Sequence, residues 1–356
     1  METRVLGKTG LKFSVLSFGC GAVGGLMVKG AAADQERAVA RAMELGINYF
    51  DTAPMYGNGE SERNLGRVLK ALKRPKVCVG TKVFVEGTGD IGKFIADSMD
   101  ASLKRLGLDS VDLYQLHNPI SEAKREGTID PKAVREHVLP TFEHLRKQGK
   151  ARHFGFTALG DTPAIQSVLD AFESAQVSYN LLNPSAGAKL PSDYPAQDYG
   201  DLIERARANG IGTVGIRVLA GGALSGVVTR HPLGMQSVDP IGSASSYARD
   251  VARAIRFGEV VKRGFAKDLV ELSIRYVPSN LNLTSTPLGE QLEHAAQSAK
   301  KRRCGRGVEA LVTTRSSRVH CEFFFQWAWT AHTVPITLAD PIYSRHAGVI
   351  SADIFS

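Results

Sequence analysis

The sequence predicts an α/β protein in which eight βα units close into a (β/α)8 TIM barrel. Up to about residue 218, short apolar runs alternate with amphipathic stretches, which is typical of βα units built around a parallel sheet. Successive units recur about every thirty residues, and seven in a row favour a closed barrel over an open sheet. The predicted strands are Val15–Gly19, Asn48–Phe50, Lys76–Thr81, Val111–His117, Arg152–Phe156, Gln176–Asn180 and Gly212–Arg217.

The helices between these strands are predicted from their ends and their apolar faces. Asp34 is expected to cap the first helix, which ends at Gly46. Glu60 and Glu62 place negative charge in the first turn of the second helix, and Thr162-Pro163 opens a later one. The expected buried stripes are Ala38, Ala42 and Leu45; Leu65, Leu69 and Leu72; Ile95, Met99, Leu103 and Leu106; and Leu202, Ile203 and Ala206.

The first residues predict a hairpin, and the last unit of the barrel has the weakest pattern. Thr3–Leu6 and Lys12–Ser14 are joined across Lys8-Thr9-Gly10, so we expect a small hairpin that plugs the barrel floor. The eighth unit is expected to contain a helix at Lys267–Val277, a strand near Leu283–Leu288 and a helix at Gln291–Ala299.

Periodicity disappears in the last part of the chain. We therefore expect residues 1–300 to form the barrel and residues 301–356 to form a divergent C-terminal tail. The tail contains an aromatic cluster, Glu322–Trp329, with both tryptophans of the chain. Such a cluster can pack on the barrel, line a substrate pocket or meet a partner.

Composition excludes several classes of protein. The chain of 356 residues is 43% hydrophobic and 22% charged, as globular proteins are. No apolar run approaches the ~20 residues of a membrane span, and the N-terminus lacks the apolar segment of a secretory signal. Cys20, Cys78, Cys304 and Cys321 are too few and too scattered for a disulfide framework or a zinc site. A cytoplasmic protein without a metal is expected.

The chain is basic, with a formal net charge of +8. This balance suits an anionic partner such as a phosphorylated cofactor, or it reflects only a solvated basic surface. Part of the excess lies at residues 300–303 and Arg306. We do not expect nucleic-acid binding, because no aromatic-rich RNA motif or zinc-finger spacing accompanies that run.

One glycine motif resembles a dinucleotide fingerprint. Gly19–Gly24 matches G-x-G-x-x-G after a strand, and Asp51 would serve as the ribose-binding acid. That fingerprint requires a helix that begins directly at the glycines, so that its amides hold the pyrophosphate. Here residues 24–30 intervene and the helix is expected only near Asp34, so the sequence disfavours this interpretation.

Four polar residues lie at or just after the ends of consecutive predicted strands. Each alone has an ordinary structural explanation, such as a turn cap, a surface aromatic, an edge charge or a core histidine. Together they predict an active site, because the C-terminal ends of barrel strands converge on one face. The four residues are Asp51, Tyr56, Lys82 and His117.

These residue types suit proton donation to a carbonyl oxygen. A phenol is a weak acid at neutral pH, and we expect Lys82 to lower the pKa of Tyr56 while Asp51 holds Lys82 in place. His117 would hydrogen-bond the substrate oxygen beside Tyr56. Because no side chain supplies hydride, the set implies a nicotinamide cofactor.

At these residues the chain resembles the aldo-keto reductases, which are NAD(P)H-dependent carbonyl reductases built on a (β/α)8 barrel. The resemblance covers residues 1–226 well and residues 265–300 loosely. It implies that Tyr56 is the acid/base, that Asp51 and Lys82 tune it, and that His117 orients the substrate. The segments that carry it are Asn48–Gly57, Gly59–Glu62, Thr81-Lys82, Ser102–Gly107 and Asp112–His117.

The resemblance also implies a set of cofactor contacts. Thr157 and Gln176 would hold the carboxamide, the stretch beginning at Arg217 would cover the pyrophosphate, and Gln291 would reach the adenosine. Ala158 and Ile216 depart from the family, which commonly has an asparagine and an aromatic residue there, and Ser285–Glu293 is compressed. The full expected set is Gly21, Asp51, Thr157, Gln176, Arg217, Leu219, Gly221 and Gln291.

The resemblance implies reduction of an aldehyde or ketone with NADPH. NADH is the alternative cofactor, and oxidation of a sugar or alcohol is the alternative direction. A second hypothesis is a non-catalytic barrel that senses a cofactor or binds a partner, which the departures at Ala158, Ile216 and the eighth unit favour. The complete set of four polar residues disfavours it.

Overall fold

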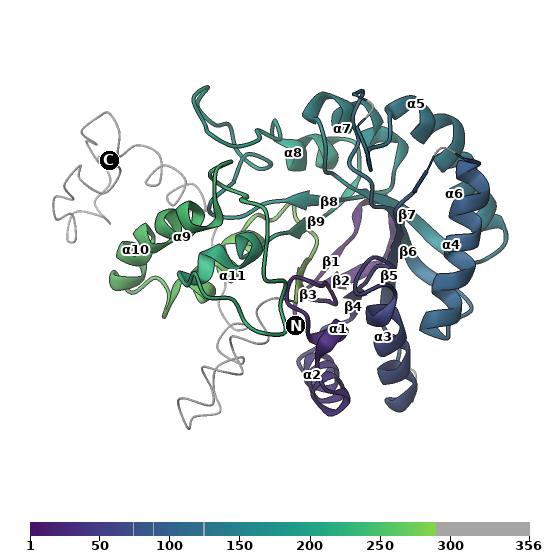
Figure 1. Cartoon of the computed structure of the whole chain (residues 1–356), viewed down its shortest axis with the longest axis horizontal. Coiled ribbons are helices and arrows are strands. Elements are labelled where there is room, and N and C mark those ends of the chain that lie inside the picture. Colours follow the sequence, from purple (N-terminus) through teal and green to yellow (C-terminus); the bar gives the residue numbers. More distant parts are fainter. Residues whose placement is uncertain (74, 88, 124, 290–356) are drawn as a thin grey trace. The chain divides into compact units, whose positions relative to one another are not determined.

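The computed structural model shows a ring of eight parallel strands, in the order β10-β3-β4-β5-β6-β7-β8-β9 (Figure 1). The structure describes residues 1–73, 75–87, 89–123 and 125–289. The ring closes between β9 and the segment before β10, where the Gly215 amide donates to the Ser285 carbonyl at 2.9 Å. The predicted TIM barrel is confirmed. Its strands are β3 (Leu16–Gly19), β4 (Tyr49–Asp51), β5 (Cys78–Val83), β6 (Val111–Leu116), β7 (Ala151–Thr157), β8 (Ser174–Ser178), β9 (Gly212–Ile216) and β10 (Thr286–Leu288).

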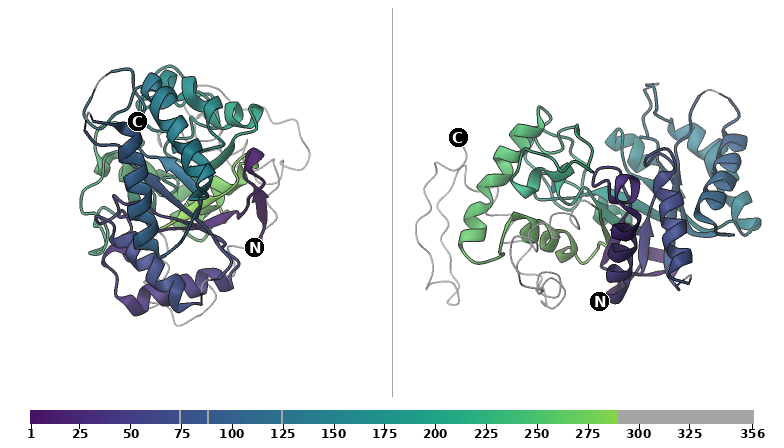
Figure 2. Two further views of the ribbon diagram at one scale, coloured as in Figure 1. Left: turned by 90° about the vertical axis from the view of Figure 1, so that its right-hand side faces the viewer. Right: turned by 60° about the horizontal axis from the view of Figure 1, so that its bottom comes forward.

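Helices cover the outside of this ring, and the views in Figure 2 show α3 and α4 running beside the strands. No helix in the described part of the chain is both long enough and apolar enough to cross a membrane. The helices are α1 (Leu26–Lys29), α2 (Ala32–Glu44), α3 (Glu60–Ala71), α4 (Ile91–Leu106), α5 (Pro131–Ala133), α6 (Leu139–Lys147), α7 (Thr162–Val168), α8 (Leu202–Ala208), α9 (Tyr247–Arg256), α10 (Gly258–Lys262) and α11 (Leu269–Ser279), with a π-helical turn, η2 (Val134–Val138), before α6.

The predicted first turns of α3 and α7 are confirmed, but the predicted N-cap of α2 is wrong. Glu60 and Glu62 lie in the first turn of α3, and Pro163 lies in the first turn of α7. Asp34 does not cap α2, because the helix begins two residues earlier, at Ala32. This earlier start places the Asp34 carboxylate in the first turn, near the positive end of the helix dipole. The fully buried stripe of α2 is Gln35, Val39 and Ala42, whereas Ala38 and Leu45, which were expected in it, are only partly buried.

The glycine-rich segment after β3 also differs from expectation. A short helix, α1, begins at Leu26 directly after Gly25, so the expectation of no helix before Asp34 was wrong. Gly25 has a φ of 82°, and its missing Cβ would lie 1.9 Å from the Leu233 carbonyl oxygen. The glycine is therefore required by a close approach of the 231–235 segment. The open-sheet dinucleotide fold is excluded by the closed barrel itself.

The predicted hairpin is present and packs into the barrel floor. Strands β1 (Thr3–Val5) and β2 (Lys12–Ser14) pair antiparallel. Leu6 and Phe13 are completely buried in one cluster with core residues of the barrel strands. The Phe13 ring stacks on Tyr49 of β4, with ring centroids 4.0 Å apart. The hairpin thus closes the end of the barrel opposite the strand C-termini.

The eighth unit is present but shorter than predicted. Its helix is α11, and its strand is only Thr286–Leu288, preceded by the bridge that closes the barrel. The sequence did not predict α9 and α10, which lie between β9 and α11. The predicted helix Gln291–Ala299 and the tail 301–356 lie outside the described residues.

The floor plug yields a stability prediction. Phe13→Ala removes a buried ring and leaves a cavity against Tyr49, so the free energy of unfolding should fall by about 3–5 kcal/mol in urea titrations. Val5→Ala changes a side chain on the same hairpin that is 50% exposed and is the control. An equal loss in the two variants would contradict the plug.

Candidate active site

The four residues predicted as catalytic lie at neighbouring strand ends. Asp51 is the last residue of β4, Lys82 is the fifth of the six residues of β5, and His117 follows β6 directly. Tyr56 lies in the loop between β4 and α3. Because β4, β5 and β6 are adjacent and parallel, their C-terminal ends meet at one face of the barrel.

A compact set of hydrogen bonds holds the Tyr56 loop. The Ser61 hydroxyl donates to the Cys20 carbonyl at 2.8 Å and lies 2.8 Å from the Thr52 hydroxyl. The Ser61 amide donates to the Tyr56 carbonyl, and the Tyr56 amide donates to the Ala53 carbonyl. These bonds tie the start of α3 to β3 and β4, which fixes the phenol relative to the strand ends.

Lys82 is the centre of the site. Its Nζ donates to Asp51 Oδ2 at 2.7 Å, to the Thr52 carbonyl at 2.8 Å and to the Tyr56 phenol oxygen at 3.4 Å. An ammonium has three hydrogens, and these three acceptors use all of them. Since the phenol oxygen accepts from Lys82, the phenol hydrogen is left to point elsewhere.

Asp51 collects further donors on its other oxygen. Oδ1 accepts from Gln176 Nε2 at 2.7 Å, from the Tyr49 hydroxyl at 3.0 Å and from Gln115 Nε2 at 3.3 Å. Neither Tyr49 nor Gln115 was predicted to be a site residue. Each precedes a site residue by two positions, and residues two apart in a strand share a face, so this signal was present.

The electrostatics of Tyr56 differ from expectation. Burial raises the pKa of the phenol, and the opposing effect of Lys82 does not overcome it, so the pKa lies above its ordinary value. The expected net lowering was therefore wrong. Burial alone would lower the pKa of Lys82. The nearby Asp51 and Tyr56 have the opposite and larger combined effect, so the pKa is raised above its ordinary value and the lysine stays charged.

His117 is held neutral. Burial, and then the positive charges of Lys82 and Arg217, lower the pKa of the imidazole to about 3. The ring meets the Tyr56 ring edge-on, with centroids 5.9 Å apart. Among the described residues, no side chain or backbone group bonds its buried Nδ1 atom. Such an imidazole is suited to hydrogen bonding rather than to carrying charge.

The residues predicted to contact a cofactor divide into two groups. Thr157 ends β7 and pairs in register with Gln176 of β8; both are buried, and Gln176 bonds Asp51. A Cβ on Gly21 would lie 3.9 Å from the Tyr56 ring. The other group follows β9, where Leu219 and Gly221 belong to the glycine-rich turn and Arg217 precedes it. The remaining predicted contact, Gln291, lies outside the described residues.

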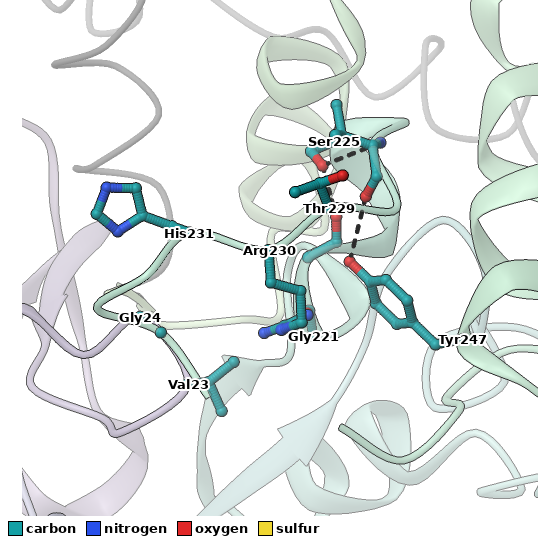
Figure 3. Close-up of a pocket in the computed structure, with 11 residues that line it drawn as sticks. Val23, Gly24, Gly221, Ser225, Thr229, Arg230, His231 and Tyr247 are labelled. Carbon is teal, nitrogen blue, oxygen red and sulfur yellow. Dashed lines mark hydrogen bonds between the residues drawn. The ribbon is translucent and has the colours of Figure 1, made fainter. Parts of the chain in front are cut away.

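A pocket lies between the β3 loop and this turn, η4 (Ala220–Ser225) (Figure 3). Gly221 lines it together with Val23 and Gly24. Arg230 enters it, bonds the Gly221 carbonyl and lies over the Tyr247 ring. Arg230 was not predicted from the sequence, because it lies in a segment without periodicity. In the described part of the chain, no cluster of three or more metal-ligating side chains occurs.

The buried ion pair yields a stability prediction. Asp51→Leu leaves the Lys82 charge buried without its counter-ion, so the free energy of unfolding should fall by about 3–5 kcal/mol. The double variant Asp51→Leu/Lys82→Met should recover much of this loss. Asp97→Ala, which breaks an exposed pair with Lys93, is the control. A double variant as unstable as the single one would contradict this account.

The neutral imidazole yields a pH prediction. NMR signals of the His117 ring, assigned by comparison with His117→Asn, should not titrate between about pH 8 and about pH 5. Because the folded pKa lies below the unfolded value of about 6.5, this residue stabilises the fold above that pH and loses the contribution as the pH falls toward 3. A His117 titration midpoint near pH 6.5 in the folded protein would contradict the assignment of a neutral, buried imidazole.

Several known proteins resemble this chain in sequence or in fold. L-galactose dehydrogenase of Arabidopsis thaliana is 31% identical over 295 residues, 81% of this chain and 84% of that protein. A relative described as a voltage-gated potassium channel subunit beta, from Schizosaccharomyces pombe, is 33% identical over 242 residues, 63% of each chain. The solved structure of AKR11C1 from Bacillus halodurans (holo form) superposes with a TM-score of 0.64 at 20% identity, covering 92% of this chain and 96% of that one. The family model for the Aldo/keto reductase family matches residues 15–303, and the chain belongs to this family.

Proposed function

We propose that the protein is an oxidoreductase that reduces an aldehyde or ketone with NADPH, NADH being the alternative cofactor and sugar or alcohol oxidation the reverse direction. Family membership supports an oxidoreductase. The observation that carries the proposal is the chain of contacts from Asp51 through Lys82 to the Tyr56 phenol. The bound nicotinamide would supply hydride to the carbonyl carbon.

The protein's part in this reaction is to place and hold a proton. Lys82 donates to the phenol oxygen, so the Tyr56 hydrogen is free to point to a substrate oxygen. The raised pKa keeps the phenol protonated at neutral pH, which is the form an acid needs before it donates. As the substrate oxygen takes the proton, the nearby ammonium stabilises the phenolate. Neutral His117 donates a hydrogen bond that orients the same oxygen.

The residues present fit a nicotinamide cofactor. Thr157 and Gln176 offer a buried hydroxyl and a buried amide side by side, 3.5 Å apart, which suits a carboxamide. In the turn after β9, Leu219 has φ −96° and ψ 16°, while Ala220 and Gly221 have φ values of 49° and 66°. A succession of right- and left-handed residues turns backbone amides toward one point, which suits a pyrophosphate. Arg230 would add a positive charge there.

The alternative is a barrel that binds a cofactor or a partner without catalysis. The potassium channel subunit among its relatives supports it, as do Ala158 and Ile216 at positions where the family commonly has other residues. The complete contact set around Lys82 supports the enzyme, because a site without catalysis has no need to keep a charged lysine buried beside a phenol.

The proposal is tested with Tyr56→Phe. This change removes the proton donor and leaves the ring in place, so turnover of aldehydes should fall by about 10²–10⁴-fold. NADPH affinity, measured by fluorescence titration, should remain near that of the parent protein.

Tyr194→Phe is the matched control. It removes a phenol oxygen that bonds the Leu182 carbonyl and none of the four residues, and it should keep turnover. Unchanged turnover in Tyr56→Phe would refute the role of the phenol. Cofactor binding by the parent protein without turnover of any carbonyl would support the non-catalytic barrel.

A further inference from the structure

Arg217 is a partly buried cation at the mouth of the barrel. It is the first residue after β9, at the strand end that faces the same side as the four site residues. Among the described residues, no carboxylate or other acceptor bonds its guanidinium. Other partly buried arginines do have such partners: Arg67, Arg105, Arg146 and Arg275 each bond a glutamate. A partly buried charge without a counter-ion is unfavourable unless a ligand supplies one.

The backbone of Arg217 is strained. Its φ is 61°, in the left-handed region that favours glycine, and the Ala220 amide holds the turn by donating to the Arg217 carbonyl at 2.8 Å. Glycine would adopt this conformation without strain, and glycines do occupy positions 221 and 222. A large side chain retained in such a conformation is a feature of binding sites.

Arg217 acts electrostatically on the site through its positive charge. It is close enough to His117 for its positive charge to contribute to the low pKa of that imidazole. The Lys82 charge is compensated by Asp51 on the inner side. Arg217 is therefore the charge left to act on a molecule that enters the mouth beside His117.

We propose that Arg217 binds an anionic group of the substrate, so that the preferred substrates are aldehydes or ketones that carry a carboxylate or a phosphate. This inference rests on the proposed function and names its substrate class. The family resemblance predicts instead that Arg217 contacts the cofactor pyrophosphate. The position of Arg217 at the end of β9, on the same face as His117, favours the substrate, and Leu219–Gly221 with Arg230 are the residues proposed above for the pyrophosphate. A planar guanidinium matches either anion through two parallel hydrogen bonds.

The test compares charged and neutral forms of one substrate. The pairs are 4-oxobutanoate with its methyl ester, and glyceraldehyde 3-phosphate with glyceraldehyde. In Arg217→Asn the ratio of kcat/KM for the charged member to that for the neutral member should fall by about 10- to 100-fold, mainly through KM. Asparagine tolerates the left-handed backbone, so the variant should fold. Arg217→Lys keeps the charge but loses the planar guanidinium, so its ratio should lie between those of the parent protein and Arg217→Asn.

Arg37→Asn is the control, because it removes an equal charge from the exposed surface of α2. An unchanged ratio in Arg217→Asn would overturn the inference. So would an NADPH dissociation constant that weakens while the ratio stays constant, since this would assign the residue to the cofactor.

A parent protein that turns over neither member of a pair would defeat the proposed function without deciding the role of Arg217. Calorimetric titration with butanedioate in the presence of NADP⁺ decides it in that case. Binding that weakens at least 10-fold in Arg217→Asn supports the inference, and equal binding by the two proteins overturns it.

Discussion

The site depends on one buried ion pair. Lys82 and Asp51 lie 2.7 Å apart with side chains 0% and 6% exposed, so both charges have left water. An isolated pair seldom recovers that desolvation energy. Here additional hydrogen bonds satisfy both partners: the Thr52 carbonyl and the Tyr56 phenol on the lysine, and one tyrosine and two glutamines on the aspartate. The pair can therefore remain charged beside the Tyr56 phenol.

The barrel makes this arrangement possible in two ways. The parallel register of β4 and β5 sets the two residues on neighbouring strands with their side chains on the inner face. A slip of one residue would turn Lys82 outward, so register and chemistry are coupled. The hairpin closes the floor, and Tyr49 joins the two regions, since its ring stacks on Phe13 and its hydroxyl bonds Asp51. The same residue thus serves packing and electrostatics.

The charges around the mouth are divided among different tasks. The ammonium of Lys82 donates all three of its hydrogens to acceptors within the protein, and His117 is neutral. Arg217 and Arg230 lie on either side of the strained turn after β9, one near His117 and one in the pocket by the β3 loop. This separation suits a reaction in which two ligands meet, each held by its own contacts.

Periodicity and strand-end residues, read from the sequence alone, determined the barrel, the hairpin and the positions of Asp51, Tyr56, Lys82 and His117. These follow from local patterns: alternation defines strands, and closed parallel strands bring their ends together. Only the tertiary structure decided the two glutamine partners of Asp51, which lie 64 and 125 positions away, and the raised pKa of Tyr56. Desolvation depends on everything packed around a group, so burial outweighed the neighbouring lysine, which no spacing in the sequence reveals. The left-handed backbone of Arg217 likewise comes from the turn that the folded chain imposes after β9.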